Sequence, residues 1–159
     1  MNEVSFQDLA MLRRFIPTGQ ISTIISAFAG EEGQFFRERL YEVAAAVRAT
    51  PVTRKTEGVA DPIVHLHYFV GSLDAWIIER DVGDGQCEPG VGPQHQAYGY
   101  VDMGYGPELG YISLPELFKA GAELDLHWNP VTAAAALEMA QVASHVAINP
   151  SFRAAEEIA

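Results

Sequence analysis

The runs IVHLHYFV (residues 63–70) and LDAWIIER (residues 73–80) are separated only by Gly71 and Ser72. Both runs are dense in β-branched, aromatic and aliphatic residues, which favour extended strands. A short connection containing glycine between two such runs is typical of a β-hairpin. The sequence therefore predicts a hairpin at residues 63–80, from which a sheet extends.

The residues that follow the hairpin predict the rest of this sheet. Three further segments have strand character, at residues 97–103, 109–112 and 122–128. Between the last two, Ser113 to Glu116 combines a capping residue with an early proline, which predicts a short helix. Residues 81–93 are rich in Gly, Pro and Asp, and we expect a long exposed loop there.

Helices are predicted at both ends of the chain. Ser5 and Asp8 have the spacing of a capping box, and Asn129–Pro130 resembles the start of a C-terminal helix. Apolar residues recur at helical spacing in three segments: Ile21, Ile24, Ile25 and Phe28; Phe36, Leu40, Val43 and Val47; and Ala135, Met139, Val142 and Val146.

These elements together predict a single α+β domain over residues 1–159. Strands that follow one another without crossover helices indicate a mainly antiparallel sheet of about five strands. We expect N-terminal helices in residues 1–50, the sheet with one inserted short helix in residues 63–128, and a C-terminal helix and tail in residues 129–159. The helices are expected to cover one face of the sheet.

The net charge of the 159 residues is −11, and it is unevenly distributed. Residues 1–56 carry seven Lys/Arg and six Asp/Glu, whereas residues 57–159 carry three Lys/Arg and fifteen Asp/Glu, a net of −12. Such a field repels phosphate backbones, so direct nucleic-acid binding is not expected. It favours a basic protein partner or cations, and it also promotes solubility.

The composition indicates a cytoplasmic protein. Apolar residues make up 48% of the chain, but no uninterrupted run is long enough to cross a bilayer. The residues after Met1 lack the basic and apolar regions of a signal peptide. Cys87 is the single cysteine, which excludes an internal disulfide.

Four motifs in the predicted sheet resemble a known family. They are WIIERD (residues 76–81), YGYV (98–101), ELGYISLPEL (108–117) and ELDL (123–126). In this order they are similar to the bacterial family called domain of unknown function 2958, over roughly residues 63–128. Members occur on plasmids, phages and integrative elements, so the resemblance implies a mobile-element setting and a role in defence or counter-defence. It implies no catalytic residue or cofactor.

Two pairs of residues raise the hypothesis of a metal site. His65 and His67 are two apart in a predicted strand and would share one face of the sheet. Asp125 and His127 are likewise two apart, and they could complete a zinc or iron site if the strands were adjacent. The alternative, which we prefer, is that these histidines are packed or hydrogen-bonded, so no cofactor is expected.

Aromatic and acidic residues within the motifs suggest a binding surface instead. Tyrosines presented on a strand and its turns can form a recognition surface at low entropic cost, although they also pack in cores. The candidate binding residues are Trp76, Glu79, Asp81, Tyr98, Tyr100, Tyr105, Glu108 and Tyr111.

The sequence contains no complete catalytic motif. A non-enzymatic accessory or protein-interaction domain of a mobile element is therefore the favoured hypothesis. A small metal-dependent enzyme using the His/Asp residues, and a module that binds a small ligand, are the two alternatives.

Overall fold

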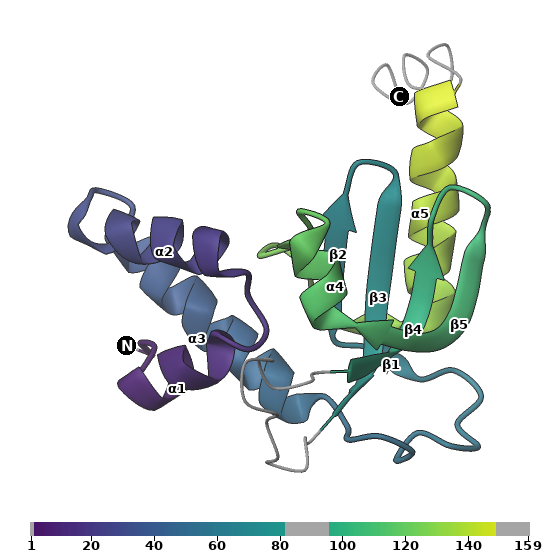
Figure 1. Ribbon diagram of the computed structural model, residues 1–159, viewed down its shortest axis with the longest axis horizontal. Coiled ribbons are helices and arrows are strands. Elements are labelled where there is room, and N and C mark those ends of the chain that lie inside the picture. Colours follow the sequence, from purple (N-terminus) through teal and green to yellow (C-terminus); the bar gives the residue numbers. More distant parts are fainter. Residues whose placement is uncertain (1, 82–95, 149–159) are drawn as a thin grey trace.

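The computed structural model describes residues 2–81 and 96–148 (Figure 1). The helices are α1 (Phe6–Leu12), α2 (Thr18–Ser26), the 3-10 turn η1 (Ala27–Ala29), α3 (Gly33–Ala49), α4 (Leu114–Lys119) and α5 (Ala133–Ile148). The strands are β1 (Ile63–Val64), β2 (Leu66–Val70), β3 (Leu73–Arg80), β4 (Gln96–Asp102), β5 (Pro107–Ser113), β6 (Glu123–Leu124) and β7 (Val131–Thr132).

Five of these strands form one antiparallel sheet in the order β5-β4-β3-β2-β6, and β1 pairs separately with β7. The predicted α+β fold with a mainly antiparallel five-stranded sheet is therefore confirmed. The hairpin is also confirmed, because Val70 pairs with Leu73 and Gly71 has a φ of 55° at the turn. Most of the predicted loop at residues 81–93 lies outside the described residues.

The predicted first strand is interrupted at His65. Val64 belongs to the apolar cluster beneath α5, whereas Leu66 belongs to the cluster beneath the N-terminal helices. Residues two apart on a regular strand share a face. The chain therefore twists between Val64 and Leu66, which separates β1 from β2.

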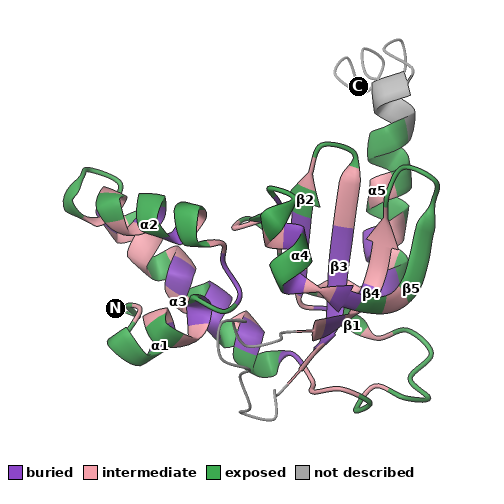
Figure 2. Ribbon diagram, viewed as in Figure 1, coloured by how far each residue is buried: buried purple, intermediate pink, exposed green. Residues whose placement is uncertain are grey.

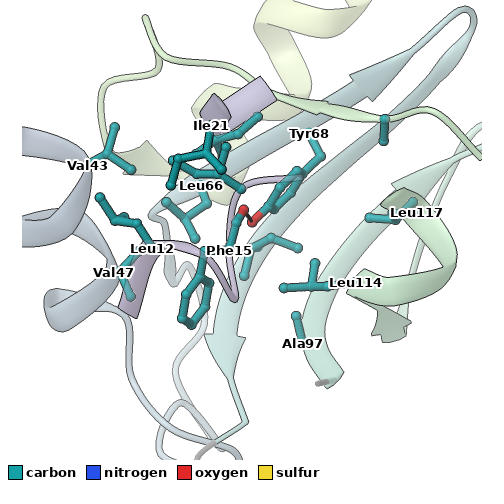
Figure 3. Packing of buried hydrophobic residues seen from close by; sticks show 14 of the residues in the cluster. Leu12, Phe15, Ile21, Val43, Val47, Leu66, Tyr68, Ala97, Leu114 and Leu117 are labelled. Carbon is teal, nitrogen blue, oxygen red and sulfur yellow. Dashed lines mark hydrogen bonds between the residues drawn. The ribbon is translucent and has the colours of Figure 1, made fainter. Parts of the chain in front are cut away.

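The N-terminal helices pack on one face of the sheet. The predicted capping box is confirmed, since Asp8 N–H donates to the Ser5 hydroxyl and Ser5 N–H donates to the Asp8 carboxylate. The apolar faces of the N-terminal helices pack against β2, β3 and α4 in the main core. There the fully buried Tyr68 donates a hydrogen bond to the Phe15 carbonyl (Figure 3). Burial raises the pKa of the Tyr68 hydroxyl far above its usual range.

Helix α5 packs on the opposite face of the sheet, so the expectation that helices cover one face is wrong. Ala133 and Ala136 of α5 contact Val64, Trp76 and Ile78 in a second apolar cluster. Small alanine side chains allow close contact with the large indole. For this reason Met139 and Val142, which belong to the predicted stripe, are about half exposed (49% and 48%).

Two local predictions near α5 also differ from the structure. The helix begins at Ala133 after β7, and Thr132 rather than Asn129 caps it by accepting from Ala135 N–H at 3.2 Å. The predicted strand at residues 122–128 is reduced to β6, because Asp125 turns the chain by accepting from His127 N–H at 2.9 Å. None of the helices in the described part of the chain is long and apolar enough to cross a bilayer.

Candidate functional site

Four aromatic and aliphatic side chains of β4 and β5 line a groove on the face that also carries α5. Strand register places Tyr98 opposite Tyr111 and Tyr100 opposite Leu109. Loop residues 54–62 form the other wall, and the groove has a volume of about 730 Å³. We call these four residues and this loop the tyrosine groove.

The outer half of the tyrosine groove is open to solvent. Leu109 and Tyr111 on β5 are 50% and 63% exposed, and β5 is exposed along most of its length (Figure 2). The Tyr98 and Tyr111 rings meet edge to face with their centroids 5.3 Å apart. Edge-to-face contact is a favoured arrangement of aromatic pairs. The groove therefore offers aromatic surface beside an exposed strand.

Gly99 explains how β4 lies so close to β3. A Cβ at this position would lie 1.9 Å from the Trp76 carbonyl oxygen, which no side-chain residue could tolerate without moving the backbone. The strand that approaches Gly99 this closely is β3. The pairing of β3 with β4 shifts register between Ile77 and Glu79, opposite this region.

The Glu79 side chain lies beneath the tyrosine groove and holds its loop in place. Its carboxylate is buried and accepts hydrogen bonds from Arg54 N–H (2.7 Å), from Thr56 N–H (2.9 Å) and from the Thr56 hydroxyl. Arg54 has a φ of 72°, a left-handed conformation that is rare for a residue with a side chain. The Glu79 carboxylate is therefore buried and occupied by the loop, so the structure shows a positioning role for this candidate binding residue.

Burial and hydrogen bonding act in opposite directions on Glu79. Burial raises the pKa of its carboxyl, but hydrogen bonds from the Thr56 hydroxyl and from the Arg54 and Thr56 amides stabilise the charged form. The hydrogen bonds prevail, and the pKa of Glu79 lies below its usual range. The loop is thus held by an ionised carboxylate.

The remaining candidate binding residues are distributed around the groove. Trp76 is buried beneath α5, while Asp81 follows β3 and donates its N–H to the Gln96 carbonyl at 2.9 Å. Tyr105, which is 98% exposed, lies with Glu108 at a second hollow beside β5 of about 310 Å³. The structure therefore brings Tyr98, Tyr100 and Tyr111 together and places Tyr105 and Glu108 alongside. Trp76 pairs with Tyr100 across β3 and β4 but is buried under α5, and Asp81 lies at the end of β3.

His67 lies between two carboxylates rather than beside His65. Its Nε2 is 2.8 Å from Asp74 Oδ1 and its Nδ1 is 3.1 Å from Asp125 Oδ2. The ring also stacks on Trp76, with a centroid distance of 5.7 Å and an interplanar angle of 17°. Both contacts are hydrogen bonds when both ring nitrogens carry protons. His67 therefore joins β2, β3 and the segment after β6.

The expected pairing of His65 with His67 is wrong, because the interruption before β2 directs them to different hollows. His65 lies with α3 residues, and its Nδ1 is buried without a hydrogen-bond partner among the residues that the structure describes. Burial lowers the pKa of the His65 imidazole and favours the neutral ring. His127 is exposed in the turn after Asp125. Within residues 2–81 and 96–148, no group of three or more His, Cys, Asp or Glu side chains could hold a metal ion.

Sequence reasoning missed two contributors to this region. Asp74 reaches His67 diagonally across the hairpin, and the short turn that pairs Val70 with Leu73 was the signal that could have placed it there. Loop residues 54–62 gave no comparable signal. Their position depends on Glu79, which is distant in sequence.

Acidic residues dominate the described part of the sheet region. Residues 57–81 and 96–148 contain eleven Asp/Glu and two Lys/Arg, Arg80 and Lys119. The Arg80 Nε donates to the Thr50 carbonyl at 3.1 Å. The sheet region therefore carries a net negative charge, whereas the groove wall itself begins with the cations Arg54 and Lys55.

No protein-family model, no curated protein and no solved structure matches the chain.

Proposed function

We propose that this chain is a non-enzymatic protein-interaction domain that binds a basic partner through β5 and the tyrosine groove. The observation that carries the proposal is the exposed apolar surface of β5, formed by Leu109 and Tyr111, within an acidic sheet region. Buried aromatic contacts supply most of the energy at such interfaces, whereas opposite charges accelerate and orient the encounter.

The contacts of the other candidates support a structural role for them. Glu79 holds the loop, and both ring nitrogens of His67 lie against carboxylates. Because each ring nitrogen faces a carboxylate, His67 is better placed to link strands than to act as a metal ligand. The metal-dependent alternative therefore has less support than the interaction surface.

The biological setting is proposed from the resemblance to the domain of unknown function 2958. We infer a cytoplasmic accessory protein of a mobile genetic element, with a role in defence or counter-defence and without direct contact to nucleic acid. In this setting the basic partner is a host or element-encoded protein.

A pull-down with the tagged full chain from a bacterial lysate tests the proposal. The test variant is the double substitution Leu109→Ser/Tyr111→Ser, which removes the apolar surface of β5. The matched control is Phe6→Ser, because Phe6 on α1 is also apolar and is 92% exposed. We expect one basic partner that is retained by the control, lost by the double variant and released by raised salt.

A partner retained equally by all three proteins would place the interface elsewhere. Recovery of no partner at low salt would remove the interaction proposal.

A second candidate function is binding of a small ligand in the tyrosine groove. The groove volume of about 730 Å³ and its tyrosine lining favour this alternative. A thermal-shift screen of small aromatic ligands on wild type and Tyr100→Ala tests it. Stabilisation of wild type alone would support it, whereas no stabilisation by any ligand would count against it.

A further inference from the structure

The two edges of the five-stranded sheet differ in what forms hydrogen bonds with them. At the β6 edge, the Gln20 side chain from α2 donates to the Leu124 carbonyl at 2.8 Å and accepts from Leu124 N–H at 2.9 Å. A side-chain amide thus replaces a neighbouring strand there. At the β5 edge, no strand in the described part of the chain pairs with the outer side.

The β5 edge lacks most devices that prevent strand pairing. Edges are commonly protected by lysines, prolines, bulges or short length. Strand β5 has seven residues, pairs with β4 in continuous register and contains no lysine. Pro107 removes one donor at its first position only. Alternate residues beyond Pro107 therefore present backbone N–H and C=O groups to the open edge.

We propose that an extended basic segment of a partner protein binds by adding a strand to β5. This inference rests on the proposed interaction function and specifies how the contact is made. Main-chain hydrogen bonds along β5 supply affinity, and the alternate side chains of the added strand supply selectivity.

The two faces of β5 specify what the added strand must carry. On the groove face, Leu109 and Tyr111 present exposed apolar surface. On the other face, Glu108 lies opposite Val101, and a Cβ at Gly110 would meet no atom within 4 Å. This space beside a carboxylate suits the stem and charge of lysine or arginine. The fitting segment therefore alternates apolar and basic residues.

The charge of the chain selects a basic segment over a second copy of itself. Each copy carries a net charge of −11, so pairing two β5 strands brings like fields together. A basic segment experiences the opposite field. The occupant is accordingly a partner of opposite charge.

Three labelled peptides titrated into the full chain at low ionic strength provide the test, with binding read by fluorescence anisotropy. The probe is an octapeptide of alternating Lys and Val. The first comparison peptide has the same composition in two blocks, and the second has the alternating sequence with every backbone amide N-methylated. The protein variants are Glu108→Gln and Leu109→Ser, with Glu123→Gln on the opposite edge strand as the matched control.

We expect the alternating peptide to bind wild type at least about tenfold more tightly than either comparison peptide. Glu108→Gln and Leu109→Ser should each weaken binding several-fold, and Glu123→Gln should not. Equal binding of the alternating and N-methylated peptides would overturn strand addition while leaving an acidic binding surface in place. Absence of binding by every peptide would overturn both proposals. Sedimentation showing a dimer that Leu109→Lys dissociates would identify a second copy as the occupant and overturn the basic segment.

Discussion

At the residue scale, Glu79 connects the sheet to the wall of the tyrosine groove. Its carboxylate accepts hydrogen bonds from two backbone amides and one hydroxyl group of residues 54–56. Loss of a buried partner leaves such donors unsatisfied, at a cost of about 1–3 kcal/mol. We expect Glu79→Gln to lower the free energy of unfolding by about this amount, as measured by urea denaturation at neutral pH.

Glu108→Gln is the matched control for this prediction, because Glu108 is exposed. It should leave the unfolding midpoint nearly unchanged. A Glu79→Gln variant as stable as wild type would show that the carboxylate does not hold the loop.

The pKa of Glu79 also predicts a pH dependence of stability. A carboxyl whose pKa is lower in the folded than in the unfolded state stabilises the fold fully above its unfolded value, here near 4.5. That stabilisation is lost as pH falls through the lower folded pKa. The stability difference between wild type and Glu79→Gln should therefore shrink below about pH 4.5. A difference that stays constant into strong acid would contradict the lowered pKa.

His65 predicts a loss of folding stability in mild acid, at a higher pH than the loss caused by protonation of Glu79. Burial lowers the pKa of its imidazole, so the unfolded chain binds a proton more readily than the folded chain. Stability should therefore begin to fall as pH drops below 6.5, the usual value for histidine. Replacing His65 with Asn should flatten this part of the profile in urea denaturation measured between neutral and mildly acidic pH. An unchanged slope would assign the loss to other groups.

Sequence reasoning identified the groove tyrosines and preferred a hydrogen-bonded His67, which its contacts with Asp74 and Asp125 confirm, but it did not foresee the buried environment of Glu79. Tyr98 and Tyr100 share a face because strands alternate, which is a local rule. The environments of Glu79 and His67 depend on loop residues 54–56 and on Asp125, which are distant in sequence. Burial and partners at that distance are set by tertiary packing, so local patterns could not reveal them.

At the element scale, the close approach of β3 and β4 depends on Gly99. A Cβ there would lie 1.9 Å from the Trp76 carbonyl oxygen, whereas a Cβ at its cross-strand neighbour Gly110 would meet no atom within 4 Å. We expect Gly99→Ala to destabilise the protein by about 2 kcal/mol or more. Gly110→Ala should change stability by less than about 0.5 kcal/mol. Thermal unfolding of the two variants side by side makes this comparison.

Equal destabilisation of both variants would indicate a general requirement for glycine in the sheet. Stability equal to that of wild type in both variants would show that β4 can move away from β3 at little cost.

The elements themselves were largely predictable, and their packing partners were not. The hairpin and the capping box follow from local residue preferences and were confirmed. For the C-terminal helix, apolar periodicity pointed to Met139 and Val142. The structure instead packs Ala133 and Ala136 against Trp76, because small side chains allow the helix to approach a large one.

At the scale of the whole molecule, the charge and the open edge occur in the same half. The N-terminal 56 residues are nearly balanced in charge. Their helices cover one face of the sheet, and Gln20 from α2 closes the β6 edge. The sheet half carries the excess of acidic residues, and no strand within residues 2–81 and 96–148 pairs with the outer side of β5. The helices therefore complete the fold at one edge, and the β5 edge is where we propose that a partner binds.

The α+β class and the charge imbalance could both be predicted from the sequence. The sequence could not show which edge of the sheet lacks a partner, because this depends on a contact between Gln20 and Leu124, which are 104 residues apart.

Hydrogen–deuterium exchange of the full chain, with and without the alternating Lys–Val peptide, measures whether β5 receives an added strand. Backbone amides that gain a strand partner exchange more slowly. We predict reduced deuterium uptake in residues 107–113 on peptide binding, with unchanged uptake in residues 123–128 at the opposite edge. Binding without protection of residues 107–113, or protection only at the β6 edge, would contradict the proposal that β5 is the binding edge.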